Sequence, residues 1–199
     1  VGRDLSVRRE KAVMMFTGDI MCAVKHQRLA SGHQHDYFDS FRRVRDILSG
    51  ADFTAGVLET TSIDRAPFEF EQLRLLTGAP NCNSPSTFIS AVAAAGFNAV
   101  VTANNHNSDC GVEGLKAVDS EIRRCGMLNI GSMGHSLVMT DVKGIKVAVI
   151  ATTMITNNTG WDLSKSGLVN PAGIYSRDYF TELVNSARRM GAEFIAAYQ

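Results

Sequence analysis

The stretch AGFNAVVTANNHNSDCGVEGL, residues 95–115, holds a strand, a polar cluster and the start of a helix in direct succession. Its apolar run Ala99–Ala103 predicts a short buried strand. Asn104, Asn105 and His106 follow that run at once. A buried strand that leads through polar residues into a helix predicts an α/β domain, in which sites form where the strands end.

The rest of the chain repeats this alternation of strands and helices. Apolar runs predict strands at 13–16, 53–58, 99–103, 137–139, 146–151 and 192–197. Apolar residues at helical spacing, with Asp36 and Ser176 as N-caps, predict helices at 37–48, 83–96, 112–125 and 176–190. Lys143-Gly144 separates two of the strands as in a β-hairpin, so we expect some antiparallel pairing within an α/β fold.

The composition is typical of a globular domain with a real core. The chain has 199 residues, of which 45% are hydrophobic and 20% charged. Basic and acidic residues both number 20, which argues against nucleic acid and anionic lipid as partners. No apolar run reaches the roughly 18 residues that span a membrane, and no glycine-rich nucleotide-binding motif follows a strand.

Both ends of the sequence suggest that it is part of a longer chain. Residues 1–4 show no signal peptide, and the first residue is not Met, so we expect a trimmed N-terminus. The predicted strand at 192–197 stops two residues before the end. We therefore expect residues 1–199 to form a single domain that is truncated at its C-terminal end.

The four cysteines show no metal-binding spacing. Without a C-x-x-C pair, a zinc–thiolate site is not expected, and free buried thiols are favoured over a disulfide. Cys22 and Cys110 each follow a polar strand end, so those two could be close in space; the other two are Cys82 and Cys125.

Three of the predicted strands end in polar residues that suit a metal ion. Asp19 ends the first strand, Glu59 the second, and Asn104, Asn105 and His106 the third. If the strands are adjacent, these side chains share one cleft, and two neighbouring carboxylates need a cation to offset their repulsion. Oxygen ligands with one imidazole suit Mg²⁺, Mn²⁺, Fe or Zn²⁺ in a hydrolytic site. The alternative is that each cluster is a separate turn or helix cap, for which Asp and Asn are common.

Three segments together resemble the bacterial capsule-synthesis protein CapA family, which is associated with poly-γ-glutamate capsules and related in fold to calcineurin-like metallophosphoesterases. They are GDIM (18–21), LE (58–59) and the stretch 95–115 with its ANNH followed by D-x-G. The resemblance implies a layered α/β sandwich with mixed sheets and a divalent metal ion (Mn, Mg, Fe or Zn). It also implies an anionic polymer or small phosphoester substrate, other capsule-synthesis proteins as partners, and a membrane-associated or extracytoplasmic location.

The same resemblance assigns roles to individual residues. Asp19, Glu59 and Asn105 match the metal ligands, and His106 matches the imidazole that assists charge stabilisation or proton transfer to a leaving group. The supporting residues are Gly18, Asn104 and Asp109, of which Asp109 orders the loop or orients His106.

Departures from the family pattern leave two functions open. Val57 stands where the family has a bracing Asn, and Met21 where ordinary metallophosphatases have a histidine ligand. The family's later histidine segments do not occur before Gln199. One reading is metal-dependent hydrolysis or transfer at a phosphoester or γ-glutamyl bond. The other is a non-catalytic binding or export-accessory module that keeps the fold without a working metal site.

Two other features of the sequence attract attention but are expected to be incidental. The H-x-H-x-acid run at 32–36 contains His33 and His35 in a polar loop, where we expect solvated side chains rather than a metal site. Trp161 lies in a loop, where we expect partial burial rather than contact with substrate.

Overall fold

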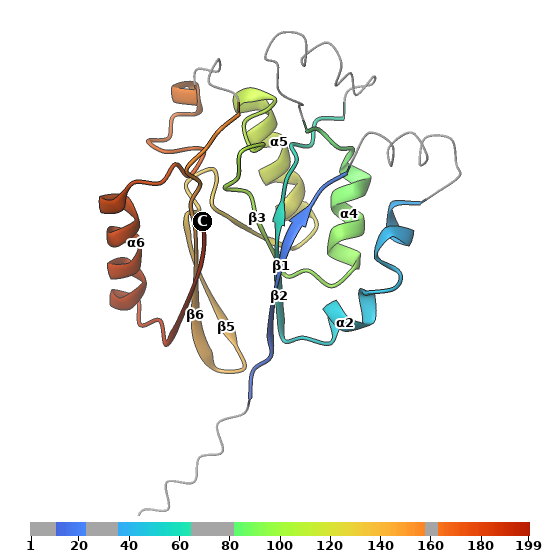
Figure 1. Ribbon diagram of the computed structural model, residues 1–199, viewed down its shortest axis with the longest axis horizontal. Coiled ribbons are helices and arrows are strands. Elements are labelled where there is room, and N and C mark those ends of the chain that lie inside the picture. Colours follow the sequence, from blue (N-terminus) through green and yellow to red (C-terminus); the bar gives the residue numbers. More distant parts are fainter. Residues whose placement is uncertain (1–10, 23–35, 65–81, 158–162) are drawn as a thin grey trace, which may run out of the picture.

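The computed structural model describes residues 11–22, 36–64, 82–157 and 163–199, which form two β-sheets with helices outside them (Figure 1). This layered α/β arrangement with a parallel and a mixed sheet confirms the predicted fold class. None of the helices in these ranges is long and apolar enough to cross a bilayer.

The first sheet has four parallel strands in the order β1-β2-β3-β4. They are β1 (Met14–Ile20), β2 (Phe53–Leu58), β3 (Ala99–Val101) and β4 (Leu128–Ile130). Helix α4 (Ser86–Ala94) precedes β3, and helix α5 (Gly111–Arg124) connects β3 to β4. Because the strands are parallel, all four carboxyl ends lie at one edge of the sheet, and β1, β2 and β3 are direct neighbours there.

The second sheet has three strands in the order β5-β6-β7. The strands β5 (Leu137–Val142) and β6 (Ile145–Ala151) form the predicted hairpin, with Lys143 and Gly144 both at positive φ in the turn. The last strand, β7 (Phe194–Tyr198), pairs parallel to β6 after helix α6 (Arg177–Arg189). Ser176 caps α6 as predicted, since its side chain accepts a hydrogen bond from the Tyr179 N–H.

Alternating residues of the first sheet pack into two separate cores. Phe53, Ala55 and Val101 face the second sheet, where they meet Val147 and Val149 of β6 in an apolar layer between the sheets. The opposite face of the first sheet packs against α4 and α5, in a core that includes Leu58, Phe88, Ile89, Val92, Val100, Val118 and Ile122. Helix α6 contacts β5 and β6, so the order of layers is helices, sheet, sheet, helix (Figure 1).

The continuous helix predicted at 37–48 is wrong. The segment divides into a 3-10 helix, η1 (Tyr37–Phe41), and a one-turn helix, α2 (Arg45–Ser49), although Asp36 caps η1 as predicted. Tyr37 and Phe41 pack against Phe88, whereas Ile47 is 61% exposed. Packing of the aromatic pair overrides the helical spacing, because only part of the apolar stripe faces the core.

Three further details of the elements differ from the sequence prediction. Strand β1 continues to Ile20 instead of ending at residue 16, and the Thr17-Gly18 segment forms a β-bulge within it. Strand β4, only three residues long, was not predicted. Helix α4 begins at Ser86 instead of residue 83, and the Asn83 amide bonds the backbone of Ile63.

Candidate functional site

The carboxyl ends of the first three strands surround one cavity of about 470 Å³. Its lining includes Asp19 from β1, Glu59 after β2, and Asn104 and Asn105 after β3. The register of the sheet explains why Asp19 and Glu59 lie at the same cavity. Asp19 pairs with Val57, and the Glu59 N–H donates to the Ile20 carbonyl at 3.0 Å. The remaining lining residues are Val57, Val101, Ala103, Thr153, Met154, Ile155, Asn157, Tyr198 and Gln199.

The negative charge of Asp19 affects the ionisation of Glu59 in this cavity. Partial burial and the negative charge of Asp19 both raise the pKa of Glu59 above its ordinary value of 4.5. The charge of His106 works in the opposite direction and Asp109 adds to the rise, so three ionisable groups, Asp19 included, act on the pKa of Glu59. A site that repels its own negative charge is suited to a bound cation.

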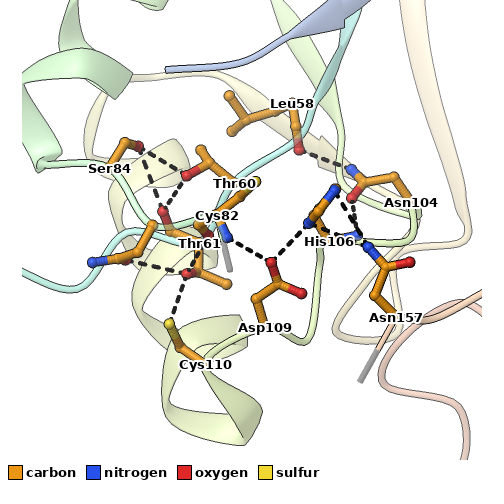
Figure 2. A network of polar contacts seen from close by, with 11 residues as sticks. Leu58, Thr60, Thr61, Cys82, Ser84, Asn104, His106, Asp109, Cys110 and Asn157 are labelled. Atoms are coloured by element: carbon orange, nitrogen blue, oxygen red, sulfur yellow. Dashed lines mark hydrogen bonds and ion pairs between the residues drawn. The ribbon is translucent and has the colours of Figure 1, made fainter. Parts of the chain in front are cut away.

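The side chain of Asn104 fixes the loop after β3 by two hydrogen bonds. Its Nδ2 donates to the Leu58 carbonyl at 2.8 Å, and its Oδ1 accepts from the His106 backbone N–H at 3.0 Å (Figure 2). The side chain is buried, and both bonds satisfy backbone groups that water does not reach. Asn104 therefore ties the end of β2 to the loop that carries Asn105 and His106.

The His106 side chain lies beside the cavity and is not among the residues that line it. Its Nδ1 donates to Asp109 Oδ2 at 2.7 Å, and the Cys82 backbone N–H donates to the same oxygen at 2.6 Å (Figure 2). The bond to Asp109, followed by contact with Cys82, raises the pKa of His106 to about 10 although burial opposes the shift. The imidazole is therefore a fixed, positively charged neighbour of Glu59 at neutral pH.

The second sheet holds this loop from the other side. After β6, the Asn157 backbone N–H donates to the Asn105 carbonyl at 2.9 Å, and its side-chain amide lies against the His106 ring (Figure 2). Asn107 Nδ2 donates to the Ala172 carbonyl at 2.7 Å. Loops from both sheets thus fix the residues at 104–109.

The structure brings together most of the residues predicted for the site. Asp19, Glu59 and Asn105 line one cavity, while His106 and Asp109 form a buried pair behind it. Gly18 lies on the bulge of β1, and a Cβ placed there would meet no described atom within 4 Å, so no crowding requires glycine at this position.

Sequence reasoning did not find two polar groups of the site, Cys82 and Asn157. Cys82 Sγ, His106 and Asp109 offer three ligand atoms within 4.8 Å of one another. This trio is buried, and Asp109 Oδ2 already accepts two hydrogen bonds that a metal ion would displace. The open cavity with its repelling carboxylates fits a cation better. Nothing in the sequence pattern marks Asn157, since it lies about 50 residues from its partners.

Other sequence predictions have simpler outcomes. All four cysteines lie in the described residues and none of them forms a disulfide, as favoured. Cys22 contacts Tyr37, whereas Cys110 Sγ lies 3.2 Å from Thr61 Oγ1. His33 and His35, Trp161 and most of the loop at 64–83 lie outside the described residues.

The chain matches a known protein family over most of its length. The family described as bacterial capsule synthesis protein PGA_cap matches residues 13–197. The capsule biosynthesis protein CapA of Bacillus anthracis is 24% identical over 151 residues, which cover 72% of this chain and 35% of that protein. Two uncharacterized proteins of Sinorhizobium fredii, y4sH and y4uA, are each 30% identical over 118 residues, covering 59% of this chain and 24% of theirs.

Among solved structures, the chain is similar to the NAD nucleotidase NadN of Haemophilus influenzae. The two share 13% identity with a TM-score of 0.43, over 81% of this chain and 27% of NadN. The chain spans about a quarter to a third of the length of the curated relatives that it matches.

Proposed function

The chain belongs to the PGA_cap family of bacterial capsule synthesis proteins, and from this premise we propose that it supplies part of a metal-dependent site that cleaves or transfers a bond during capsule assembly. A role related to capsule biosynthesis follows from the family and from the similarity to CapA. The chemistry proposed is hydrolysis or transfer at a phosphoester or γ-glutamyl bond of an anionic polymer, such as poly-γ-glutamate, or of a small phosphoester.

One observation carries this proposal: Asp19, Glu59 and Asn105 come from three adjacent parallel strands and line the same cavity. Their oxygen atoms are the hard ligands that Mg²⁺, Mn²⁺, Fe or Zn²⁺ accept. The raised pKa of Glu59 supports a cation here, because a positive ion would relieve the repulsion from Asp19. The donor set therefore fits a divalent metal ion.

When bound, such an ion polarises a phosphoryl or carbonyl oxygen and lowers the pKa of a water molecule. Residues of this chain would bind the ion and position the loop beside it. Asp19, Glu59 and Asn105 would hold the ion, and Asn104 keeps the Asn105 loop at the end of β2. In hydrolysis the oxygen of water bonds to the phosphorus or carbonyl carbon, the ester or amide bond breaks, and a proton passes to the leaving group.

His106 acts in this scheme mainly through its charge. Its imidazole lies outside the lining of the cavity but close enough to lower the pKa of Glu59. A fixed positive charge at this position favours an anionic substrate and the negative charge that develops during the reaction. Direct proton donation to a leaving group would require the ring to reach the cavity past Asn157, whose amide lies against it.

A second candidate is a binding or export-accessory module without catalysis. Val57 favours it, because an apolar side chain lines the cavity where the family resemblance leads one to expect a bracing Asn. The cavity receives all three predicted metal ligands, but the family's later histidine segments do not occur before Gln199. This non-catalytic module would have the same fold and the same polymer partner but would need no bound metal.

Metal binding and hydrolysis in the full-length protein separate these functions. Isothermal titration with Mn²⁺ and Zn²⁺ is compared for the wild type, Asp19→Asn, Glu59→Gln and Asn105→Ala, together with hydrolysis of a chromogenic phosphodiester and a γ-glutamyl anilide. We expect each substitution to weaken metal binding by at least about tenfold and to reduce hydrolysis in parallel.

The matched control is Asp178→Asn, an exposed carboxylate in the first turn of α6. It is expected to keep wild-type affinity and activity. Wild-type protein that binds neither ion and cleaves neither substrate would support the accessory module and contradict the enzyme.

A further inference from the structure

Asn157 makes two contacts with consecutive residues of the loop after β3. Its backbone N–H donates to the Asn105 carbonyl at 2.9 Å. Its side-chain Nδ2 lies 3.3 Å from His106 Nε2 and 3.4 Å from His106 Nδ1 (Figure 2). One residue of the second sheet's loop thus contacts both a proposed metal ligand and the histidine beside it.

The two contacts complement those that the first sheet makes. Asp109 accepts from Nδ1 of His106 and therefore holds one edge of the imidazole. A ring held at a single nitrogen can still tilt about that bond, and the amide of Asn157 packs against the ring, within 3.4 Å of both ring nitrogens (Figure 2). The imidazole is accordingly held between a side chain of its own loop and one from the other sheet.

The backbone contact acts on Asn105 in a similar way. Asn104 anchors the start of the loop to Leu58, but the next peptide group is fixed by Asn157 through the Asn105 carbonyl. The segment that carries Asn157 is itself braced, since the Thr153 N–H donates to the Gly173 carbonyl and the Tyr175 N–H donates to the Thr153 carbonyl. This bracing connects the segment that carries Asn157 to the loop before α6.

We propose that Asn157 is a positioning residue, whose amide orients the His106 imidazole and whose backbone N–H sets the direction of Asn105. The second sheet thereby controls a site built from the first. An Asn fits this position because its short side chain brings a polar amide to the ring while its own N–H remains committed to Asn105. Orientation of His106 is independent of the proposed function, whereas the consequence for metal affinity rests on it.

Two variants test the amide without removing the backbone bond. Asn157→Ala deletes the side chain, and Asn157→Leu replaces it with an apolar group of similar shape. In full-length protein with isotope-labelled histidine, we expect both variants to shift and broaden the His106 ring resonances. Both should also weaken Mn²⁺ and Zn²⁺ binding by about tenfold, the lower end for residues that orient metal ligands.

The matched control is Asn185→Ala, which removes an exposed carboxamide from α6 and should leave the ring resonances and metal affinity at wild-type values. Wild-type ring resonances in both Asn157 variants would overturn the proposal, as would wild-type resonances in Asn157→Leu alone, since that result assigns Asn157 only a space-filling role. Protein that binds no metal would defeat the proposed function, yet the ring resonances would still decide the role of Asn157.

Discussion

Nδ1 of His106 lies 2.7 Å from Oδ2 of Asp109, three residues further along the chain, and both side chains are buried. The pair closes the loop between β3 and α5, because the Cys82 N–H donates to the same carboxylate oxygen. A buried carboxylate that holds an imidazolium fixes both the position of the ring and its charge. This relationship leads to the first prediction.

Asp109→Asn should lower the pKa of His106 from about 10 toward its ordinary value of 6.5, because the neutral amide removes the main cause of the shift. Titration of the His106 ring by NMR measures the change. Asp178→Asn, at an exposed position on α6, should leave the His106 pKa where it is in the wild type. An unchanged pKa in Asp109→Asn would contradict the role given to this pair.

The same shift predicts how stability depends on pH. Since the folded protein binds the His106 proton more tightly, its stabilising effect is fully present below pH 6.5 and disappears as the pH rises through about 10. Urea unfolding of the wild type should therefore show a decline over this range. Asp109→Asn should show less of that decline, and equal slopes in the two proteins would refute the assignment.

Asp19→Asn should stabilise the metal-free protein while weakening its affinity for metal ions. The raised pKa of Glu59 means that ionisation of this group disfavours the folded state, so its penalty appears as the pH rises through that pKa. Removing the charge of Asp19 should increase the free energy of unfolding at neutral pH by about 0.5 kcal/mol, a typical value for exposed charge pairs. Denaturation of chelator-treated protein tests this, and a loss of stability would be the opposite result.

Gly56 and Gly18 provide a matched pair of glycine substitutions. A Cβ at Gly56 would lie 2.7 Å from Ile20 Cδ1 and 2.9 Å from Phe97 Cε1, whereas one at Gly18 would meet no described atom within 4 Å. Gly56→Ala should therefore destabilise the protein by about 1–3 kcal/mol through overpacking. Gly18→Ala should stay close to wild type in urea unfolding, and equal losses would contradict the difference in space.

Asn104→Ala should destabilise the protein by about 2–4 kcal/mol, because it leaves the buried Leu58 carbonyl and His106 N–H without their partners. The change also frees the loop that holds Asn105, so metal affinity should fall. Asn185→Ala on the exposed side of α6 controls for the loss of a carboxamide and should change stability by no more than about 0.5 kcal/mol. Similar unfolding curves for the two variants would show that Asn104 does not anchor the loop after β3 to the end of β2.

Sequence patterns predicted the elements whose residues are apolar at regular intervals and bounded by turn residues. The buried strands β2, β3 and β6 and the cap of α6 at Ser176 are examples, because burial and capping are local properties of the chain. The helix at 37–48 was misjudged, since the packing of Phe41 against Phe88 and Phe97 is not local. The strand β4, with three residues, is too short to show a period.

The sequence by itself determined that polar residues follow three apolar strands, and it offered Asp19, Glu59 and the cluster at 104–106 as candidates. The family resemblance then selected Asp19, Glu59 and Asn105 as metal ligands. The parallel order of β1, β2 and β3 places them at one cavity, because parallel strands end at the same edge. Only the tertiary structure decided which groups surround His106. Cys82 and Asn157 reach it from distant parts of the chain, and such contacts depend on how the loops and sheets pack rather than on spacing along the sequence.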